Sequence, residues 1–110
     1  HKFGVLISRW RWRMLFIATY TIHSGNRNIA MERFLQSGGK VPAGIKMLGR
    51  WHTVAKLSGF AVIEADDAAL IQQWAMEWSD ILSMEVFPAL TDEQVGPLMF
   101  AELAKKKVVV

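Results

Sequence analysis

The stretch Gly44–Thr53 (GIKMLGRWHT) constrains the fold of this chain more than any other part of the sequence. We interpret it as a β-strand, in which successive side chains point to opposite faces of the sheet. One face would then carry Leu48 and the residues that can bear charge, Lys46, Arg50 and His52. The other face would carry Met47, Gly49, Trp51 and Thr53. Charged side chains in a small apolar domain must meet water, a ligand or a partner chain, so this strand is where a site is expected.

The first half of the chain predicts a strand, a helix and then this central strand. Met14–Ile22 is rich in β-branched and aromatic residues and too short for an amphipathic helix, which favours a strand. After a turn, Asn26 or Asn28 is expected to cap a helix that runs to Leu35. A glycine-rich loop ends this helix and leads into the central strand, for which we predict the bounds Ile45–Thr53.

The next segments predict a hairpin followed by a second helix. Gly59–Ala65 has the composition of a third strand, and the short reversal before it makes the pairing with the central strand antiparallel. Asp66 or Asp67 is expected to cap the second helix, with its acid at the positive end of the helix dipole. The apolar residues of this helix recur at helical spacing, and they are Leu70, Ile71, Trp74, Trp78, Ile81 and Leu82.

The end of the chain predicts an edge strand and one more helix. Met84–Leu90 has the pattern of the last strand, and its Pro88 favours the edge of a sheet. Thr91 and Gln94 form a capping-box signature for a C-terminal helix. The order is therefore β-α-β-β-α-β with an added helix. This is the ferredoxin-like α+β pattern, a four-stranded antiparallel sheet with two helices on one face.

Two helices cover only one face of such a sheet and leave the other face exposed. Because hydrophobic residues make up 52% of the chain, the open face would carry a large apolar patch. Contact with a second copy through that face would remove the patch, so we expect a homodimer with two-fold symmetry. The domain would span residues 14–90, and a C-terminal helix with a basic tail would occupy residues 91–110.

Residues 1–13 are interpreted as a basic N-terminal extension outside the fold. They contain no acid, and their cations are Lys2, Arg9, Arg11 and Arg13. Removing these four from the 13 Lys and Arg leaves nine against ten Asp and Glu, so the body of the chain is mildly acidic. That balance argues against nucleic acid as a partner. No segment has the roughly 20 apolar residues of a membrane-spanning helix, and we expect a cytoplasmic protein.

Four segments of the chain resemble a known family: GIKMLGRWH, GFAVIEADD, WSDIL and EVFPAL. Their spacing is similar to that in a family of small, mostly bacterial and cyanobacterial proteins that is catalogued as a domain of unknown function. The resemblance covers roughly residues 14–90. The family is placed near the dimeric α/β-barrel superfamily, so the resemblance implies a ferredoxin-like fold and a dimeric α/β barrel. Members of that superfamily, which include cofactor-independent monooxygenases and lactone isomerases, share the barrel and not the chemistry.

The candidate site combines polar residues of the predicted strands. Arg50 and His52 would share a sheet face with Glu64 in one of the possible registers of the second and third strands. Tyr20 and Glu85, on the flanking strands, would line the same space. His52 is the candidate catalytic acid or base, and the candidate ligand-binding residues are Arg50, Glu64, Tyr20 and Trp51. The structural alternative is a cross-strand ion pair between Arg50 and Glu64.

Three functions are compatible with these residues. The leading hypothesis is a homodimeric small-molecule-binding or structural module with an apolar cavity. The alternative is a cofactor-independent enzyme of the monooxygenase or isomerase type, in which His52 is the acid or base, Arg50 holds an anion and Glu64 orients the imidazole. An RNA-binding module is the second alternative, although Phe60 lacks an aromatic neighbour at Val62 and Glu64 would repel phosphate. No cofactor is expected, and the spacing of the histidines predicts no metal site.

Overall fold

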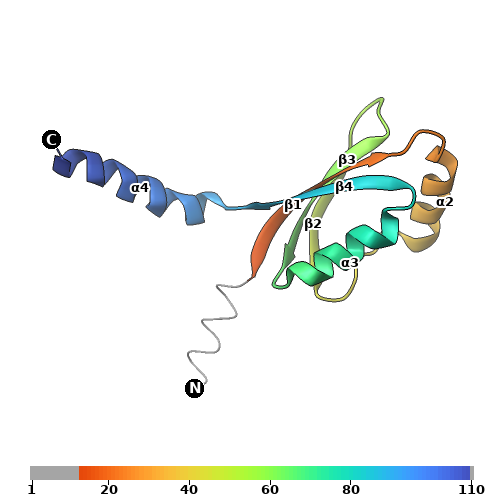
Figure 1. Ribbon diagram of the computed structural model, residues 1–110, viewed down its shortest axis with the longest axis horizontal. Coiled ribbons are helices and arrows are strands. Elements are labelled where there is room, and N and C mark those ends of the chain that lie inside the picture. The colour runs from red at the N-terminus through yellow and green to blue at the C-terminus, as the bar shows by residue number, and fades with distance from the viewer. Residues whose placement is uncertain (1–12, 110) are drawn as a thin grey trace, which may run out of the picture.

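The structure is a computed structural model that describes the backbone of residues 13–109 and the side chains of residues 13–105 (Figure 1). The predicted basic extension lies outside the described residues except for Arg13, which directly precedes the first strand. None of the helices in the described part of the chain is long and apolar enough to cross a membrane.

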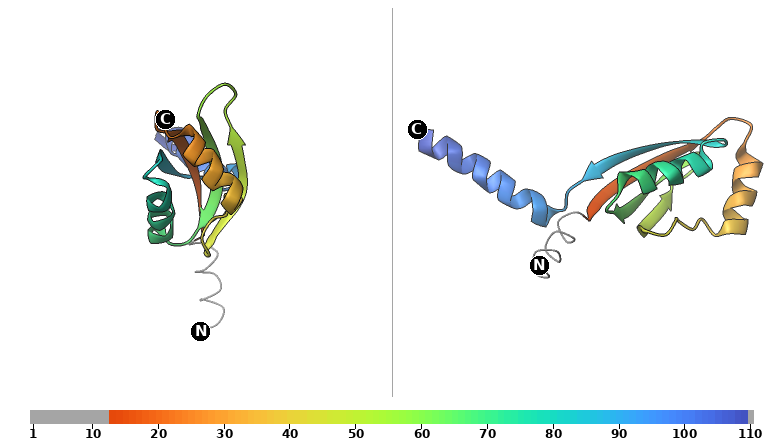
Figure 2. Two further views of the ribbon diagram at one scale, coloured as in Figure 1. Left: turned by 90° about the vertical axis from the view of Figure 1, so that its right-hand side faces the viewer. Right: turned by 60° about the horizontal axis from the view of Figure 1, so that its bottom comes forward.

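Four strands and three helices follow one another in the predicted order. They are β1 (Met14–Ile22), α2 (Arg27–Ser37), β2 (Ile45–His52), β3 (Ser58–Ala65), α3 (Ala68–Trp78), β4 (Leu82–Ala89) and α4 (Asp92–Val109). The strands form one sheet in the order β2-β3-β1-β4, and every neighbouring pair is antiparallel. Helices α2 and α3 lie on the same side of this sheet, whereas α4 projects away from it (Figure 2). The ferredoxin-like α+β prediction is confirmed, and Pro88 lies on an edge strand as expected.

The hydrophobic core lies between the sheet and its two covering helices. Alternate residues of the central strands point into it, and Ile63 is 0% exposed at the middle of β3. The strand residues in this layer include both small and large side chains. Those buried in the main core cluster are Phe16, Ala18, Ile45, Ile63 and Ala65, together with Ile71 and Trp74 of α3.

Two helix starts follow the predicted capping chemistry. Asp67 caps α3, because its carboxylate accepts a hydrogen bond of 2.9 Å from the backbone N–H of Ala69. Thr91 and Gln94 form the predicted capping box of α4, with the backbone N–H of each bonded to the side chain of the other. Asn26 occupies the N-cap position of α2 but makes no side-chain cap; its amide donates instead to the carbonyl of Asp80.

The apolar stripe of α3 ends earlier than the sequence predicts. The helix stops at Trp78, and the hydroxyl of Ser79 closes its last turn by donating to the carbonyl of Met76. Ile81 and Leu82, which were predicted to continue the stripe, are buried in a second core cluster next to the start of β4. They keep the apolar pattern because a buried strand end requires it as much as a helix face does.

A β-bulge in β2 changes which residues share a face of the sheet. The register against β3 shifts between Met47 and Gly49, so Leu48 has no partner of its own. Lys46 stands opposite Glu64 before the bulge, and Arg50 stands opposite Ala61 after it. Since an extra residue reverses the alternation, Lys46 points to the open face while Arg50 points to the helix-covered face. The prediction that these two side chains share a face is therefore wrong.

Candidate functional site

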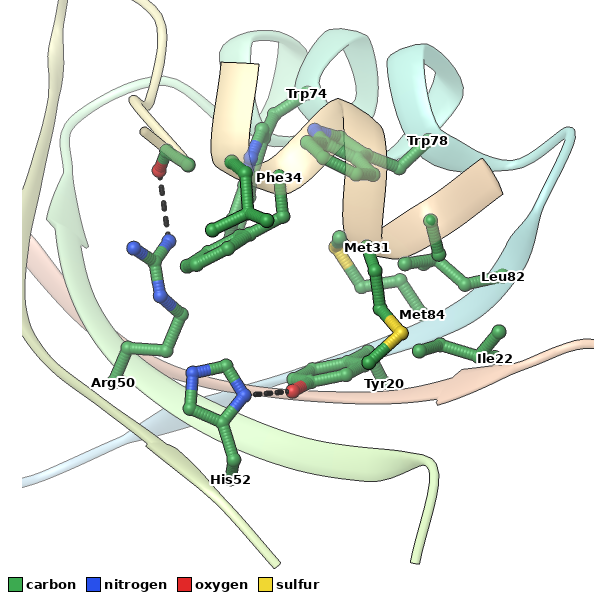
Figure 3. Close-up of a pocket in the computed structure, with 13 residues that line it drawn as sticks. Tyr20, Ile22, Met31, Phe34, Arg50, His52, Trp74, Trp78, Leu82 and Met84 are labelled. Atoms are coloured by element: carbon green, nitrogen blue, oxygen red, sulfur yellow. Dashed lines mark hydrogen bonds between the residues drawn. The ribbon is translucent and has the colours of Figure 1, made fainter. Parts of the chain in front are cut away.

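A pocket of about 330 Å³ lies between the helix-covered face of the sheet and helices α2 and α3. Its walls are mostly apolar, and they come from α2, α3, β1 and β4 (Figure 3). The residues that form most of these walls are Met31, Phe34, Trp74, Trp78, Leu82 and Met84. Polar side chains reach the pocket along one side only, from Tyr20 of β1 and from Arg50 and His52 of β2 (Figure 3).

Arg50 brings a positive charge to the pocket without a carboxylate partner among the described residues. Its Nη1 donates a hydrogen bond of 2.7 Å to the carbonyl oxygen of Gly39, in the loop after α2. Its guanidinium carbon lies 4.7 Å from the centre of the Phe34 ring, a cation–π contact. These contacts fix the side chain and leave most of the five guanidinium N–H groups without a protein acceptor.

Gly39 is the residue that lets the guanidinium approach the loop so closely. Its φ is +64°, in the left-handed region, where a side chain is strained. A Cβ atom at this position would lie 2.6 Å from Nη2 of Arg50 and 2.5 Å from Cε1 of Phe34. The glycine therefore meets two requirements at once, a turn after α2 and space for Arg50.

Tyr20 and His52 form a hydrogen-bonded pair across three strands. The Tyr20 hydroxyl lies 2.5 Å from Nδ1 of His52, and the His52 ring packs edge-on against Phe34 with their centres 5.6 Å apart. Gly59 of β3 stands between them, because it is the register partner of Tyr20 on one side and of His52 on the other. A Cβ atom on Gly59 would lie 2.6 Å from the Tyr20 ring, so the pair forms over a residue that has no side chain.

The protonation of Tyr20 responds to its place in the pocket. Burial raises the pKa of its hydroxyl above the ordinary value, and the nearby Arg50 guanidinium lowers that pKa in part. Tyr20 is consequently a neutral hydrogen-bonding group over the whole physiological pH range.

An ion pair outside the pocket connects α2 to the turn after α3. Arg33 donates two hydrogen bonds to the carboxylate of Asp80, of 2.9 and 2.7 Å, and a third to the carbonyl of Glu77. The hydrogen bonds from Arg33 hold the pKa of Asp80 below its usual range. The same guanidinium lies 5.4 Å from the ring centre of Trp78, which is a pocket wall. These contacts join the two helices on either side of the pocket.

Three of the six residues considered for the site lie on the other face of the sheet. Glu64 pairs with Arg13 at 3.2 Å, so the predicted shared face and ion pair with Arg50 are both wrong. Glu85 stands opposite Thr19 on the open face and lines no wall of the pocket. Trp51 stacks on Phe60 on that face, with ring centres 5.4 Å apart. Tyr20, Arg50 and His52 are the residues that the structure does bring together.

Sequence reasoning missed several pocket residues because their pattern also fits an ordinary core. Trp74 and Trp78 belong to the predicted stripe of α3, and Phe34 lies on the apolar side of α2. The signal that was available is the pair Trp74 and Trp78, one turn apart on α3, together with Phe34 on α2. No group of three or more His, Asp or Glu residues in the described part of the chain is arranged to hold a metal ion.

Comparison with known proteins adds a family and no activity. A family model described as "Domain of unknown function (DUF3303)" matches residues 14–103. No curated protein and no solved structure matches the chain. Because the family model covers most of the chain, from the first strand into α4, the chain belongs to this family.

Proposed function

We propose that this member of the DUF3303 family binds a small organic acid with an apolar body in the pocket between its sheet and its helices. The observation that carries the proposal is the guanidinium of Arg50, which reaches an apolar pocket without a carboxylate partner among the described residues. A guanidinium matches the geometry of a carboxylate, and the resulting charge-assisted hydrogen bonds are among the strong ones in proteins.

The arrangement of the walls supports a ligand with two unlike ends. Arg50, His52 and Tyr20 offer hydrogen bonds along one side, and the indole and thioether side chains of the helices and β4 surround the rest (Figure 3). The volume of about 330 Å³ lies at the lower end of the range for small-molecule sites. A carboxylate would sit at Arg50, and an aromatic or branched body would lie against Phe34, Trp74 and Trp78.

A matched pair of probes tests the anion preference. We expect 3-phenylpropionate to bind more tightly than the neutral 3-phenylpropan-1-ol, by about 10- to 100-fold in Kd, because only the acid gains the charge-assisted bonds to Arg50. Arg50→Gln should remove this preference, as measured by isothermal titration calorimetry. Lys46→Gln is the matched control, since Lys46 lies on the same strand and the opposite face.

Two results would count against the binding proposal. One is equal affinity of the wild-type chain for the acid and the alcohol, including the absence of measurable binding of either. The other is an acid preference that survives in Arg50→Gln or disappears in Lys46→Gln. Each variant replaces a cation with the same neutral glutamine side chain, so the change in net charge is identical in the two.

A second candidate function is supported by the hydrogen-bonded pair of Tyr20 and His52 at the pocket. His52 is the acid or base of a cofactor-independent enzyme of the monooxygenase or isomerase type, and Tyr20 holds its ring in place. Such an enzyme removes a proton from a carbon next to a carbonyl group. The imidazole takes that proton, the electron pair passes to the carbonyl oxygen as an enolate, and the reverse step returns a proton to the carbon.

Exchange of hydrogen for deuterium reports this proton transfer directly. In D₂O the chain should accelerate the exchange of the CH₂ protons of phenylpyruvate, followed by NMR, and His52→Asn should lose the acceleration while the Kd for 3-phenylpropionate changes less than threefold. If exchange in the presence of the wild-type chain is no faster than in buffer alone, the chain does not catalyse this proton transfer, and the proposal of a binding module remains.

The open face of the sheet supports a homodimer, as in the dimeric α/β-barrel superfamily. Its exposed apolar side chains lie on all four strands, and they are Ile17, Trp51, Phe60 and Phe87. A patch of this kind on a monomer marks an interaction surface. Glu64 and Glu85 stand among these residues, and their carboxylates disfavour RNA as the partner because they repel phosphate.

A further inference from the structure

Helix α4 is the part of the described chain that packs least against the rest. It leaves the sheet after β4 and projects into solvent, away from the other helices (Figures 1 and 2). It makes no extensive contact with any other described strand or helix. The radius of gyration is 18.4 Å, whereas a compact domain of this length has about 13 Å. The chain is therefore more extended than one copy of a packed domain would be.

Large exposed apolar side chains cover more than one side of α4, and Phe100 is 76% exposed. Val95, Met99 and Leu103 recur at every fourth position and so lie on one face of the helix, with Leu98 beside them. Met99 and Leu103 are 59% and 63% exposed. Ala101 and Ala104 lie on the opposite side of the same helix. A helix with such a stripe in a soluble protein buries it against another surface.

The helix also needs a partner for its own stability. Gly96 and Pro97 stand inside it, and both residues destabilise a helix interior, by about 1 and 3 kcal/mol relative to Ala. In proteins, most of the stability of a helix comes from tertiary packing of its apolar side chains rather than from helix propensity. Packing of the apolar stripe is what compensates for these two residues.

We infer that α4 packs against a second copy of the chain and extends the interface formed by the open face of the sheet. The inference rests on the proposed homodimer. Exposed apolar side chains occur at both ends of the connection to α4: Phe87 lies on the open face of β4, and Leu90 precedes the helix. Two unpartnered apolar surfaces on one chain, joined through the same strand, are both covered when two identical copies associate about a two-fold axis.

The areas support an interface that includes α4. One face of four strands, each about 26 Å long and about 4.8 Å from the next, offers about 500 Å². A stable interface of standard size removes about 800 Å² from each partner. One side of α4, about 27 Å long and about 10 Å wide, adds about 270 Å². The sheet face alone falls short of a standard interface, and the sheet with α4 reaches it.

Sedimentation equilibrium of full-length variants tests the role of α4. The double variant Met99→Lys/Leu103→Lys should weaken the dimer by about 30-fold or more, because charged side chains would enter an apolar contact. The matched control, Ala101→Lys/Ala104→Lys, adds the same charge on the other side of the helix and should change the dimer Kd by less than threefold. Because α4 makes no extensive contact with the other described elements, neither variant should alter the thermal unfolding of the domain at a dilution where the chains are separate.

A variant on the sheet separates this inference from the proposed dimer. Phe60→Lys should also dissociate the dimer, since Phe60 is exposed on the open face of β3, one of the two central strands. If Phe60→Lys dissociates the dimer and Met99→Lys/Leu103→Lys does not, the sheet interface stands and the inference about α4 is wrong. A wild-type chain that stays monomeric up to millimolar concentration would overturn both. Equal weakening by the two α4 variants would overturn the inference that this stripe makes the contact.

Discussion

The two faces of the sheet differ in the size of their side chains. On the helix-covered face, Ala18 and Ala61 are register partners and Gly59 is their small neighbour, and aromatic side chains of α2 and α3 lie above them. On the open face, the same strands carry Ile17 and Phe60 at the neighbouring positions. Small strand residues leave room for a second layer and for a pocket within it. Large ones extend outward and require a layer from another molecule.

The faces also differ in charge. Arg50 and His52 lie on the covered face, while the carboxylates of Glu64 and Glu85 lie on the open one. The bulge at Leu48 causes this separation, because an uninterrupted strand would place Lys46 and Arg50 together. The pocket consequently holds a cation that no nearby acid of the described chain neutralises, and this is what makes it suited to an anionic ligand.

The largest expected effect comes from removing a buried side chain on the covered face. Ile63→Ala should lower the free energy of unfolding by about 2–5 kcal/mol, because Ile63 is 0% exposed and the cavity cannot refill. Ile17→Ala makes the same change on the open face, where Ile17 is 38% exposed, and should cost about 1 kcal/mol or less in the separated chain. Urea denaturation at low protein concentration measures both. Equal costs would mean that the open face is packed within a single chain.

An intermediate effect is expected from adding one methyl group to a glycine of each face. Gly59→Ala should cost about 1–3 kcal/mol, because its Cβ would lie 2.5 Å from the backbone oxygen of Trp51 and 2.6 Å from the Tyr20 ring. Gly49→Ala should cost less, since the atoms nearest to its Cβ belong to the far end of the Trp51 side chain, which is 52% exposed and shifts more easily than backbone. Thermal unfolding of the two variants compares them. A larger loss for Gly49→Ala would reverse the comparison.

The smallest expected effect is a shift in the titration of Tyr20, the one tyrosine of the chain. Because burial raises its pKa, the folded chain holds this proton more tightly than the unfolded one. The stability that the folded chain gains from this proton is fully present below about pH 10, near the pKa of Tyr20 in the unfolded chain. It is lost as the pH rises through the higher pKa of Tyr20 in the folded chain. Ultraviolet absorbance of tyrosinate follows the midpoint directly.

Removal of the Arg50 charge should move that midpoint further up, because the guanidinium lowers the pKa of Tyr20. Arg50→Gln is therefore expected to raise it, and Lys46→Gln, on the other face, to leave it unchanged. A midpoint that falls in Arg50→Gln would show that the charge and the hydroxyl do not interact across the pocket.

The sequence by itself determined the elements and their order. Local signals were enough for this, as the caps at Asp67 and at Thr91 with Gln94 illustrate, because a cap joins residues three or fewer positions apart. The ferredoxin-like topology followed from that order through general rules of connection. The ends of the elements were predicted less accurately. The predicted apolar stripe ran on to Leu82, whereas α3 stops at Trp78, because a buried strand start has the same apolar character as a helix face.

The membership of the site was decided by the tertiary structure. A bulge belongs to a pair of strands rather than to one strand, so no pattern within Gly44–Thr53 revealed that Lys46 and Arg50 point to opposite faces. The pocket likewise joins Tyr20, Phe34, Arg50 and Trp78, which lie on four separate elements. Their residue types were visible in the sequence. Their meeting depends on register and helix packing, which are set by contacts between segments far apart along the chain.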